Sequence, residues 1–168
     1  MVVEEKRLAA VHSPATIVRS YKPKDLAAVL AVFHRSVHQI ASRDYTAEQI
    51  CAWAPDAPDV EAWAQRLTRQ AAFVCEIGGE IAGFGSVEPD GHLDLLYVHP
   101  GTVRRGVARA LLARIVEWCQ ARDVASLFTE ASVTARPFFE NCGFRVIEQQ
   151  EVQLRGIAMA NLRMSRAL

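Results

Sequence analysis

Two arginines and a glycine in the middle of the chain have the types and spacing of an anion-binding loop. Arg104, Arg105 and Gly106 lie between an apolar segment, Leu93 to Val98, and a segment of helical periodicity that begins near Val107. A loop that leads into a helix leaves the first N–H groups of that helix without partners, and such groups bind anions. The two guanidinium groups add positive charge. We therefore expect a ligand that carries phosphate.

The loop does not match the two best-known phosphate-binding motifs. Gly101 and Gly106 have the spacing of a P-loop, but Val107 and Ala108 follow where that motif needs Lys and Ser or Thr. A dinucleotide fingerprint needs a third glycine, which is missing here. The loop taken alone is also compatible with an ordinary strand-to-helix turn that carries solvated arginines.

The segment before the loop contains a single charged residue. Leu93 to Val98 has the apolar composition of a central, buried strand, and only Asp94 interrupts it. Strand alternation predicts that Asp94 shares a face with Leu96 and Val98. A carboxylate in such a run needs a partner or a function. Asp94 is therefore either a general base or a structural residue paired with an arginine or with His92.

Periodicity and turn residues predict both strands and helices along the chain. We expect strands over 16–21, 71–77, 81–87, 93–98, 126–131, 146–152 and 157–164, and helices over 26–42, 46–53, 59–69, 106–122 and 134–141. The right-handed crossover rule predicts that strand 126–131 runs parallel to strand 93–98. These elements predict an α/β (α+β) fold, with a mixed, mostly antiparallel sheet flanked by helices. We expect residues 15–168 to form one domain and residues 1–14 to form a loose lead.

Composition argues against several classes of function. The 168 residues include 19 basic and 19 acidic side chains, so no net charge attracts nucleic acid or a membrane surface. No apolar run reaches the ~18 residues of a membrane span, and the charged N-terminus does not resemble a secretory signal. The four cysteines do not have metal-ligand spacing, and neither do the three histidines that lie outside the predicted helices. These residues are Cys51, Cys75, Cys119 and Cys142, and His12, His92 and His99. We expect a cytoplasmic protein without a metal.

Two motifs in order resemble the GNAT acyltransferase superfamily. The family loop is Gln/Arg-x-x-Gly-x-Gly/Ala, and the run from Gly106 to Ala108 matches its end, whereas Val103 replaces the leading Gln or Arg. The run 130–144, which ends in Gly143-Phe144, is similar to the family's second landmark. Tyr45-x-x-x-Gln49 followed by Ala-Trp-Ala resembles the bacterial YafP-like acetyltransferases. The resemblance covers roughly residues 17–164.

The resemblance implies a GNAT-like domain that binds acetyl-CoA, with the pyrophosphate on the loop amides. It implies that the Val98 N–H group binds the thioester oxygen and that Ser132 replaces an Asn that often lies near the pantetheine. The cofactor-binding residues are then expected to be Tyr97, Val98, Val103, Arg104, Arg105, Gly106, Val107, Ala108, Arg109, Ser132 and Phe139.

The resemblance also suggests catalytic residues. Asp94 occupies the position of a base carboxylate, four residues before Val98. Phe139 stands where the family has its proton-donating tyrosine, so Tyr45, Tyr97 or Cys142 replaces that tyrosine, or solvent protonates the thiolate. Tyr45 and Tyr97 join Asp94 as catalytic candidates. Tyr45 adjoins a helix start, outside the predicted buried stripe, where the family's N-terminal helices contact the acceptor.

The function implied is N-acetylation of a primary amine of a small molecule or peptide by direct attack on acetyl-CoA. The alternative is a non-catalytic acyl-CoA-binding module, because Phe139 and Val103 depart from the family pattern. A nucleic-acid-binding surface formed by Arg104, Arg105, Arg109 and Arg114 is disfavoured by the zero net charge. A C-terminal edge strand makes a homodimer possible.

Overall fold

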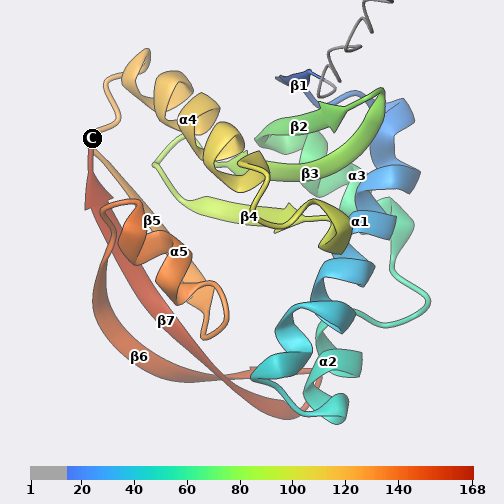
Figure 1. Cartoon of the computed structure of the whole chain (residues 1–168). Coiled ribbons are helices and arrows are strands. Elements are labelled where there is room, and N and C mark those ends of the chain that lie inside the picture. The colour runs from blue at the N-terminus through green and yellow to red at the C-terminus, as the bar shows by residue number, and fades with distance from the viewer. Residues whose placement is uncertain (1–14) are drawn as a thin grey trace, which may run out of the picture.

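The computed structural model describes residues 15–168 (Figure 1). The lead predicted over residues 1–14 lies outside this range. The strands are β1 (Thr16–Ser20), β2 (Ala71–Ile77), β3 (Glu80–Val87), β4 (Leu93–Val98), β5 (Ser126–Ser132), β6 (Arg145–Leu154) and β7 (Ile157–Ala167). The α-helices are α1 (Leu26–Gln39), α2 (Ala47–Trp53), α3 (Val60–Arg69), α4 (Val107–Gln120) and α5 (Arg136–Asn141). Every strand and helix predicted from the sequence is therefore present.

The strands form two antiparallel sheets, in the orders β1-β2-β3-β4 and β5-β7-β6. A parallel bridge joins His92, the residue before β4, to Phe128 of β5, and the two strands then diverge, as Figure 1 shows. The predicted parallel direction of 126–131 relative to 93–98 is therefore confirmed, although the two strands do not pair beyond this bridge. The crossover rule gives the direction of β5 but does not require backbone hydrogen bonds along its whole length.

A bulge in β4 changes the direction of Asp94. Ser86 pairs with Leu95, whereas the next residue of β3, Val87, pairs with Leu93, so β4 has one extra residue at this point. A bulge breaks the alternation of side chains. Asp94 consequently reaches α3 rather than sharing a face with Leu96 and Val98, and the predicted shared face is wrong.

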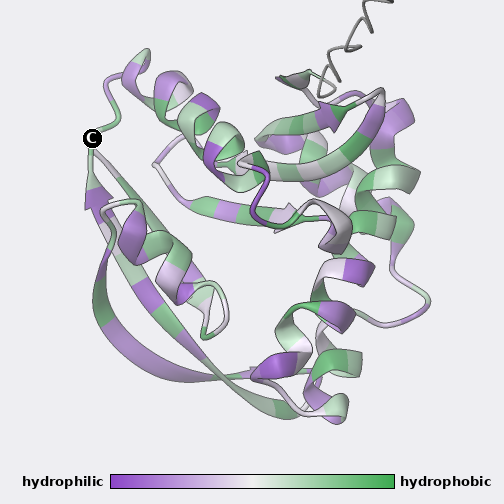
Figure 2. Cartoon of the chain, viewed as in Figure 1, coloured by the Kyte–Doolittle hydropathy of each residue, from purple (hydrophilic) through white to green (hydrophobic). Residues whose placement is uncertain are grey.

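Helices cover both faces of the first sheet. α4 packs on one face through apolar residues spaced by three and four positions, and α1 and α3 pack on the other, where β4 contributes Leu95. The helical residues buried on the two faces include Val107, Leu111, Ile115 and Cys119 in α4, and Val29, Phe33, Val37 and Leu67 in α1 and α3. Figure 2 shows the apolar positions of the helices turned toward the sheets. This packing holds β4 rigidly along the centre of the molecule.

Local signals fix the ends of several elements. Thr46 and Gln49 form the predicted capping box at α2, with Gln49 N to Thr46 Oγ1 at 3.2 Å and Thr46 N to Gln49 Oε1 at 2.9 Å. α1 ends at Gln39, three residues before the predicted end, where a 3₁₀ turn over Ala41–Arg43 replaces the last turn. α5 begins at Arg136 rather than at residue 134, with Pro137 in its first turn. No helix of the described part of the chain is long and apolar enough to cross a membrane.

Candidate active site

A cleft of about 690 Å³ lies where the two sheets diverge. β4, β5 and the first residues of α4 and α5 line it, together with the end of α1 and the last residue of α2. Eleven residues predicted from the sequence line the cleft: Asp94, Tyr97, Val98, Val103, Arg104, Gly106, Val107, Ala108, Arg109, Ser132 and Phe139. Tyr45 and Arg105 are not among the residues that line it. The structure therefore brings most of the candidate residues together.

The start of α4 offers backbone donors to the cleft. Gly106 is the N-cap, with φ of 82°, a conformation that favours glycine, and no atom lies within 4 Å of an added Cβ. The first helical hydrogen bond runs from Ala110 N to Gly106 O at 2.9 Å. Within the described residues, the N–H groups of residues 107–109 find no acceptor. They form a site for a negatively charged group.

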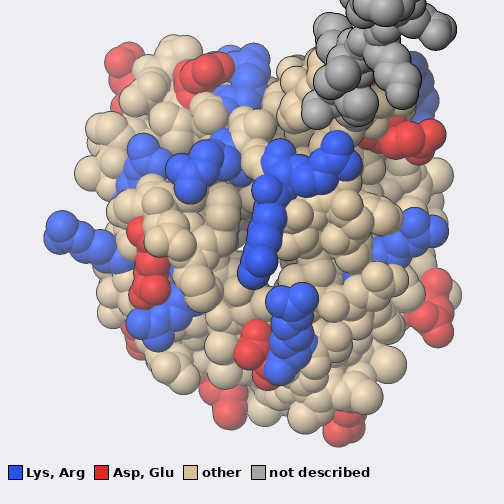
Figure 3. Space-filling view, viewed as in Figure 1, with Lys and Arg blue, Asp and Glu red and all other residues tan. Residues whose placement is uncertain are grey.

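Basic side chains surround these donors. Arg104 and Arg109 line the cleft beside the helix start, and Figure 3 shows Lys and Arg side chains gathered across the middle of this face. Arg104 has a left-handed φ of 65°. That conformation costs a non-glycine residue about 1–2 kcal/mol. The rest of the loop must therefore stabilise Arg104 in this backbone conformation. The loop combines helix-end donors with two cations, which suits phosphate groups.

The peptide of Val98 points into the gap between the sheets. His99 N donates to Ala82 O of β3 at 2.8 Å. Successive N–H groups of a strand point to opposite edges, so the Val98 N–H points away from β3 and toward β5. No residue of the described chain accepts from it. This donor can bind an oxygen that gains negative charge during a reaction.

Asp94 is held by a network that begins on α3. Its carboxylate accepts from Arg66 Nε at 2.7 Å, from Arg66 Nη2 at 2.5 Å and from Gln70 Nε2 at 2.6 Å. Gln70 in turn accepts from Ser86 Oγ at 2.6 Å. Burial alone raises the pKa of Asp94, but the hydrogen bonds from Arg66 and Gln70 outweigh it, and the pKa lies below 3.8. Asp94 lines the cleft, as a general base would, and it also pairs with an arginine, as a structural residue would. The geometry is therefore compatible with both interpretations.

Tyr97 lies in a cluster of aromatic rings. Its ring stacks on Phe84 at 5.5 Å between centroids and meets the edge of Phe33 at 5.0 Å. Trp53 Nε1 donates to its hydroxyl oxygen at 3.2 Å. Burial raises the pKa of Tyr97 to about 12, so the hydroxyl stays protonated at neutral pH. Tyr97 therefore forms a rigid, neutral wall of the cleft.

The opposite wall comes from β5 and α5. Phe139 is 4% exposed and packs edge to face on Phe144 at 5.0 Å, so it contributes shape and no proton. Ser132 Oγ accepts from Ala135 N at 3.1 Å, which leaves its hydroxyl hydrogen available to a ligand. This wall therefore combines the apolar surface of α5 with a hydrogen-bond donor at Ser132.

The expected position of Tyr45 outside the core is wrong. Tyr45 is 9% exposed and packs edge to face against Trp53 at 5.4 Å between centroids. Its hydroxyl donates to Ala160 O at 2.7 Å and accepts from Val133 N at 2.9 Å. The capping box begins at Thr46, and Tyr45, which precedes it, points into the core. The Tyr45 hydroxyl therefore links β7 to the loop after β5. Tyr45 positions the far end of the cleft.

Polar contacts close the narrow end of the gap. His92 Nε2 lies 2.6 Å from Glu130 Oε2, across the point where β4 and β5 separate. Burial lowers the pKa of His92, but the hydrogen bond to Glu130 outweighs this, and the pKa lies above 6.5. Thr129 Oγ1 donates to Leu93 O at 2.8 Å. These contacts replace the backbone pairing that the diverging strands lack.

Sequence reasoning did not identify several residues that shape the site. Arg66 and Gln70 are four positions apart at the end of a predicted helix, which indicates only a polar stripe. Trp53 was noted as part of the resemblance, but its bond to Tyr97 depends on two elements that are 44 residues apart. No sequence signal pairs Arg66 with Asp94, because tertiary packing of α3 brings them together.

Comparisons with known proteins agree with this geometry. The sequence matches the family described as Acetyltransferase (GNAT) domain over residues 41–166. It is 37% identical to the uncharacterized N-acetyltransferase YafP of Escherichia coli over 88% of this chain and 93% of that protein. It is 32% identical to an aminoglycoside N(6')-acetyltransferase of Stenotrophomonas maltophilia, over 64% of this chain and 87% of that protein.

Solved structures share the fold. A GCN5-related N-acetyltransferase from Rhodopseudomonas palustris superimposes with a TM-score of 0.88 at 35% identity, over 93% of this chain and 96% of that chain. The PaiA N-acetyltransferase of Thermoplasma acidophilum, solved with coenzyme A, gives a TM-score of 0.78 at 15% identity, over 92% and 99% of the two chains. The predicted fold class and family are confirmed. This chain belongs to the GNAT family of acetyltransferases, with YafP among its relatives, and is an N-acetyltransferase.

Proposed function

We propose that this N-acetyltransferase transfers the acetyl group of acetyl-CoA to a primary amine of a small molecule or peptide. The assignment of acetyl-CoA as the donor rests on one observation, which is that three features meet in the same cleft. These are the free N–H groups at the start of α4, the cations Arg104 and Arg109 beside them, and the free N–H of Val98. The first two features suit a pyrophosphate and the third suits a thioester oxygen. The structural neighbour PaiA is solved with coenzyme A, which supports the same donor.

The reaction is a direct attack by the amine. The neutral nitrogen attacks the thioester carbonyl carbon, the carbonyl oxygen accepts a hydrogen bond from the Val98 N–H, and the C–S bond then breaks. The attacking nitrogen loses one proton, and the thiolate gains one. Phe139 has no proton to give, and Tyr97, with a pKa of about 12, donates poorly to a thiolate whose own pKa is about 8.5. Solvent therefore protonates the leaving thiolate.

Asp94 acts on the amine through water rather than by contact. Four strand residues separate Asp94 from Val98, which corresponds to about 13 Å between their Cα atoms. An attacking nitrogen beside Val98 is therefore out of direct reach of the Asp94 carboxylate. Arg66 and Gln70 keep the carboxylate ionised, so it orients water and stabilises the positive charge that develops on the nitrogen. This is an electrostatic role with proton transfer through solvent.

The acceptor side of the cleft favours an amine with an apolar body. Val37, Ile40 and Trp53 line that side, and Arg43 lines the cleft beside them. The two acidic side chains that line the cleft are each paired, Asp94 with Arg66 and Glu130 with His92. Neither carboxylate is free to bind a highly charged polycation. A peptide amine or a small amine with an apolar substituent fits better.

The test measures acetyl-CoA binding and turnover separately. Calorimetry with acetyl-CoA should give saturable binding, and a panel of amines should release free thiol in a continuous colorimetric assay. Mass spectrometry of the product should show one added acetyl group on nitrogen. Binding without thiol release over the whole panel would favour a non-catalytic acyl-CoA-binding role, and the absence of binding would refute the donor assignment.

A further inference from the structure

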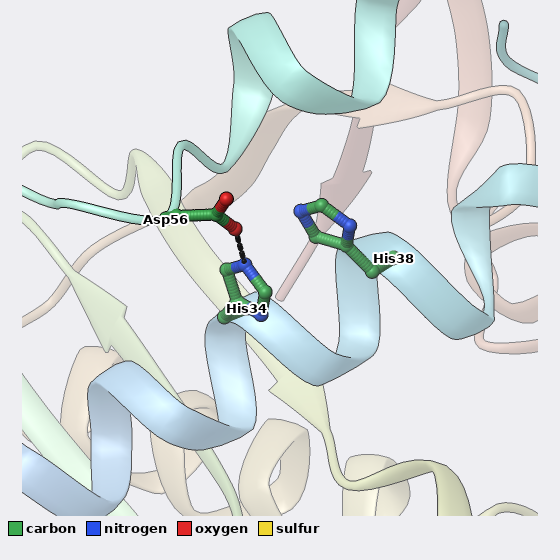
Figure 4. Close-up of side chains that lie close together, drawn as sticks. All are labelled: His34, His38 and Asp56. Atoms are coloured by element: carbon green, nitrogen blue, oxygen red, sulfur yellow. Dashed lines mark hydrogen bonds and ion pairs between the residues drawn. The ribbon is translucent and has the colours of Figure 1, made fainter. Parts of the chain in front are cut away.

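Three side chains with metal-ligand chemistry meet on the outer face of α1. His34 and His38 are one helical turn apart, and the loop between α2 and α3 places Asp56 beside them, as Figure 4 shows. One ligand atom of each residue lies within 4.8 Å of the ligand atoms of the other two. We call these residues the His34–His38–Asp56 cluster. Sequence spacing alone did not reveal it, because Asp56 comes from a separate loop.

Hydrogen bonds already orient the two imidazole rings. His34 Nε2 lies 3.0 Å from Asp56 Oδ1, and His38 Nε2 lies 2.8 Å from Ala54 O. A carbonyl oxygen only accepts, so His38 Nε2 carries a proton and donates it. The two rings stack with their centroids 4.0 Å apart and an angle of 21° between their planes. Both Nε2 atoms therefore point toward the loop, on the same side of the helix.

The donor set suits a divalent transition metal ion. Two imidazole nitrogens and one carboxylate are typical zinc ligands, at about 2.0–2.2 Å from the ion. Two atoms at that distance from one ion are about 3.0–3.4 Å apart for octahedral to tetrahedral angles. The distance of 3.0 Å between His34 Nε2 and Asp56 Oδ1 already lies within this range. The side chain of Asp56 is 94% exposed, so it can rotate to close the site.

We propose that His34, His38 and Asp56 bind one Zn²⁺ ion, with water completing the coordination. The ion replaces the proton on each Nε2 atom, and His38 exchanges its bond to Ala54 for the metal. The bound ion ties the α2–α3 loop to α1. Val37, next to His38, and Trp53, at the end of α2, line the cleft. Zinc therefore stiffens the two elements that form the acceptor side, without touching the loop at the start of α4.

The experiment titrates untagged, metal-free protein with zinc chloride in a calorimeter at pH 7.5. We expect one ion per chain and a rise in Tm that saturates with zinc concentration. His34→Gln, His38→Gln and Asp56→Asn should each weaken zinc binding by at least about 10–100-fold, the loss that follows when even an outer partner of a metal ligand is changed. Glutamine keeps a donor toward Ala54, so His38→Gln isolates loss of the ligand from loss of that hydrogen bond. Acetyl-CoA affinity should stay unchanged in all three variants.

Cys51 provides the matched control, because it is an exposed thiol on α2 outside the cluster, and cysteine is a residue type that can bind zinc. Cys51→Ser should leave the stoichiometry, the affinity and the zinc-dependent rise in Tm as in the parent. No saturable binding, equal binding by parent and cluster variants, or binding abolished by Cys51→Ser would each overturn the proposal. Because zinc and Tm are measured without acetyl-CoA, none of these results bears on the transferase activity.

Discussion

Asp94→Asn is the most informative substitution for the proposed mechanism. The change keeps the volume of the side chain and removes its negative charge. Asp94 now binds three donors, two from Arg66 and one from Gln70, and a neutral amide cannot satisfy all of them. The substitution therefore tests catalysis and stability together, and the two effects have different pH dependences.

The structure sets the size of the catalytic effect. Direct abstraction from an alkylammonium of pKa about 10.4 is strongly unfavourable, because the hydrogen bonds from Arg66 and Gln70 hold the pKa of the Asp94 carboxyl below its usual range. Asp94 thus acts on an amine that solvent has already helped to deprotonate. General acid–base catalysis typically contributes about 10²–10⁴-fold. The distance and the low pKa place the expected loss of kcat near the lower end, about 10²-fold.

The structure also sets the effect on stability. Hydrogen bonds to a charged group contribute about 1.5–3 kcal/mol, and Arg66 remains partly exposed, so about 2 kcal/mol should be lost. In a chain of this length that corresponds to a fall in Tm of about 4–8 °C. The pKa of Asp94 is lowered on folding, so its contribution is present above about pH 4 and disappears as the pH falls through the folded pKa. Parent and variant should converge in Tm once the pH is below the lowered pKa of Asp94 in the folded protein.

The assay is a pH–rate profile of thiol release for both proteins, with Tm measured in the same buffers. Asp123→Asn makes the same chemical change on an exposed turn outside the cleft and should alter neither quantity. The loss of kcat in Asp94→Asn should shrink as the pH approaches the acceptor's own pKa, while the affinity for acetyl-CoA stays within about twofold. A folded variant with parent-like kcat at every pH would refute a catalytic role and leave Asp94 as a structural partner of Arg66.

Three further predictions test other parts of the site. Gly106→Glu should abolish measurable acetyl-CoA binding in calorimetry. The change puts a negatively charged side chain at the N-cap of α4, where the phosphate groups are proposed to bind, and gives a non-glycine residue a left-handed φ. Unchanged affinity would refute the loop assignment. Tyr45→Phe should lower Tm by about 3–10 °C, since Ala160 O and Val133 N lose a buried partner worth about 1–3 kcal/mol; an unchanged Tm would contradict this. The raised pKa of His92 implies that its pairing with Glu130 stabilises the fold below pH 6.5 and weakens as the pH rises through the folded pKa. His92→Gln should therefore lower Tm more at pH 6 than at pH 9, and equal losses would exclude the ion pair as the cause.

Periodic patterns predicted the elements of this fold well. The capping residues at Thr46 and Asp59 and the hairpin turn at 78–79 depend on contacts within a few residues, and each was found where expected. The cofactor loop was also predictable, because a strand, a glycine and a helix start place its N–H groups by local geometry alone. Such features need no knowledge of the rest of the molecule.

The errors share one physical origin, which is contact between distant segments. Alternation predicted the wrong face for Asp94, because the pairing of β4 with β3 introduces a bulge that one strand does not reveal. The helical pattern placed Tyr45 outside the core, because it does not reveal the distant partners of its hydroxyl, Ala160 in β7 and Val133 in the loop after β5. In the same way, Arg66 and the His34–His38–Asp56 cluster gain their chemistry only when α3 and the α2–α3 loop dock against β4 and α1.

The division into two sheets connects the fold to the proposed donor. Beyond the His92–Phe128 bridge, the facing edges of β4 and β5 carry backbone N–H and C=O groups that another strand would normally pair. Leaving such groups buried and unpaired costs about 1–3 kcal/mol each. An extended ligand with its own amide groups can pair with both edges, and the pantetheine arm of acetyl-CoA has two amides in a chain of that kind. If acetyl-CoA is the donor, the unpaired strand edges therefore give the cleft its affinity for it. The Val98 N–H is then the backbone donor on the β4 edge that binds the reacting oxygen.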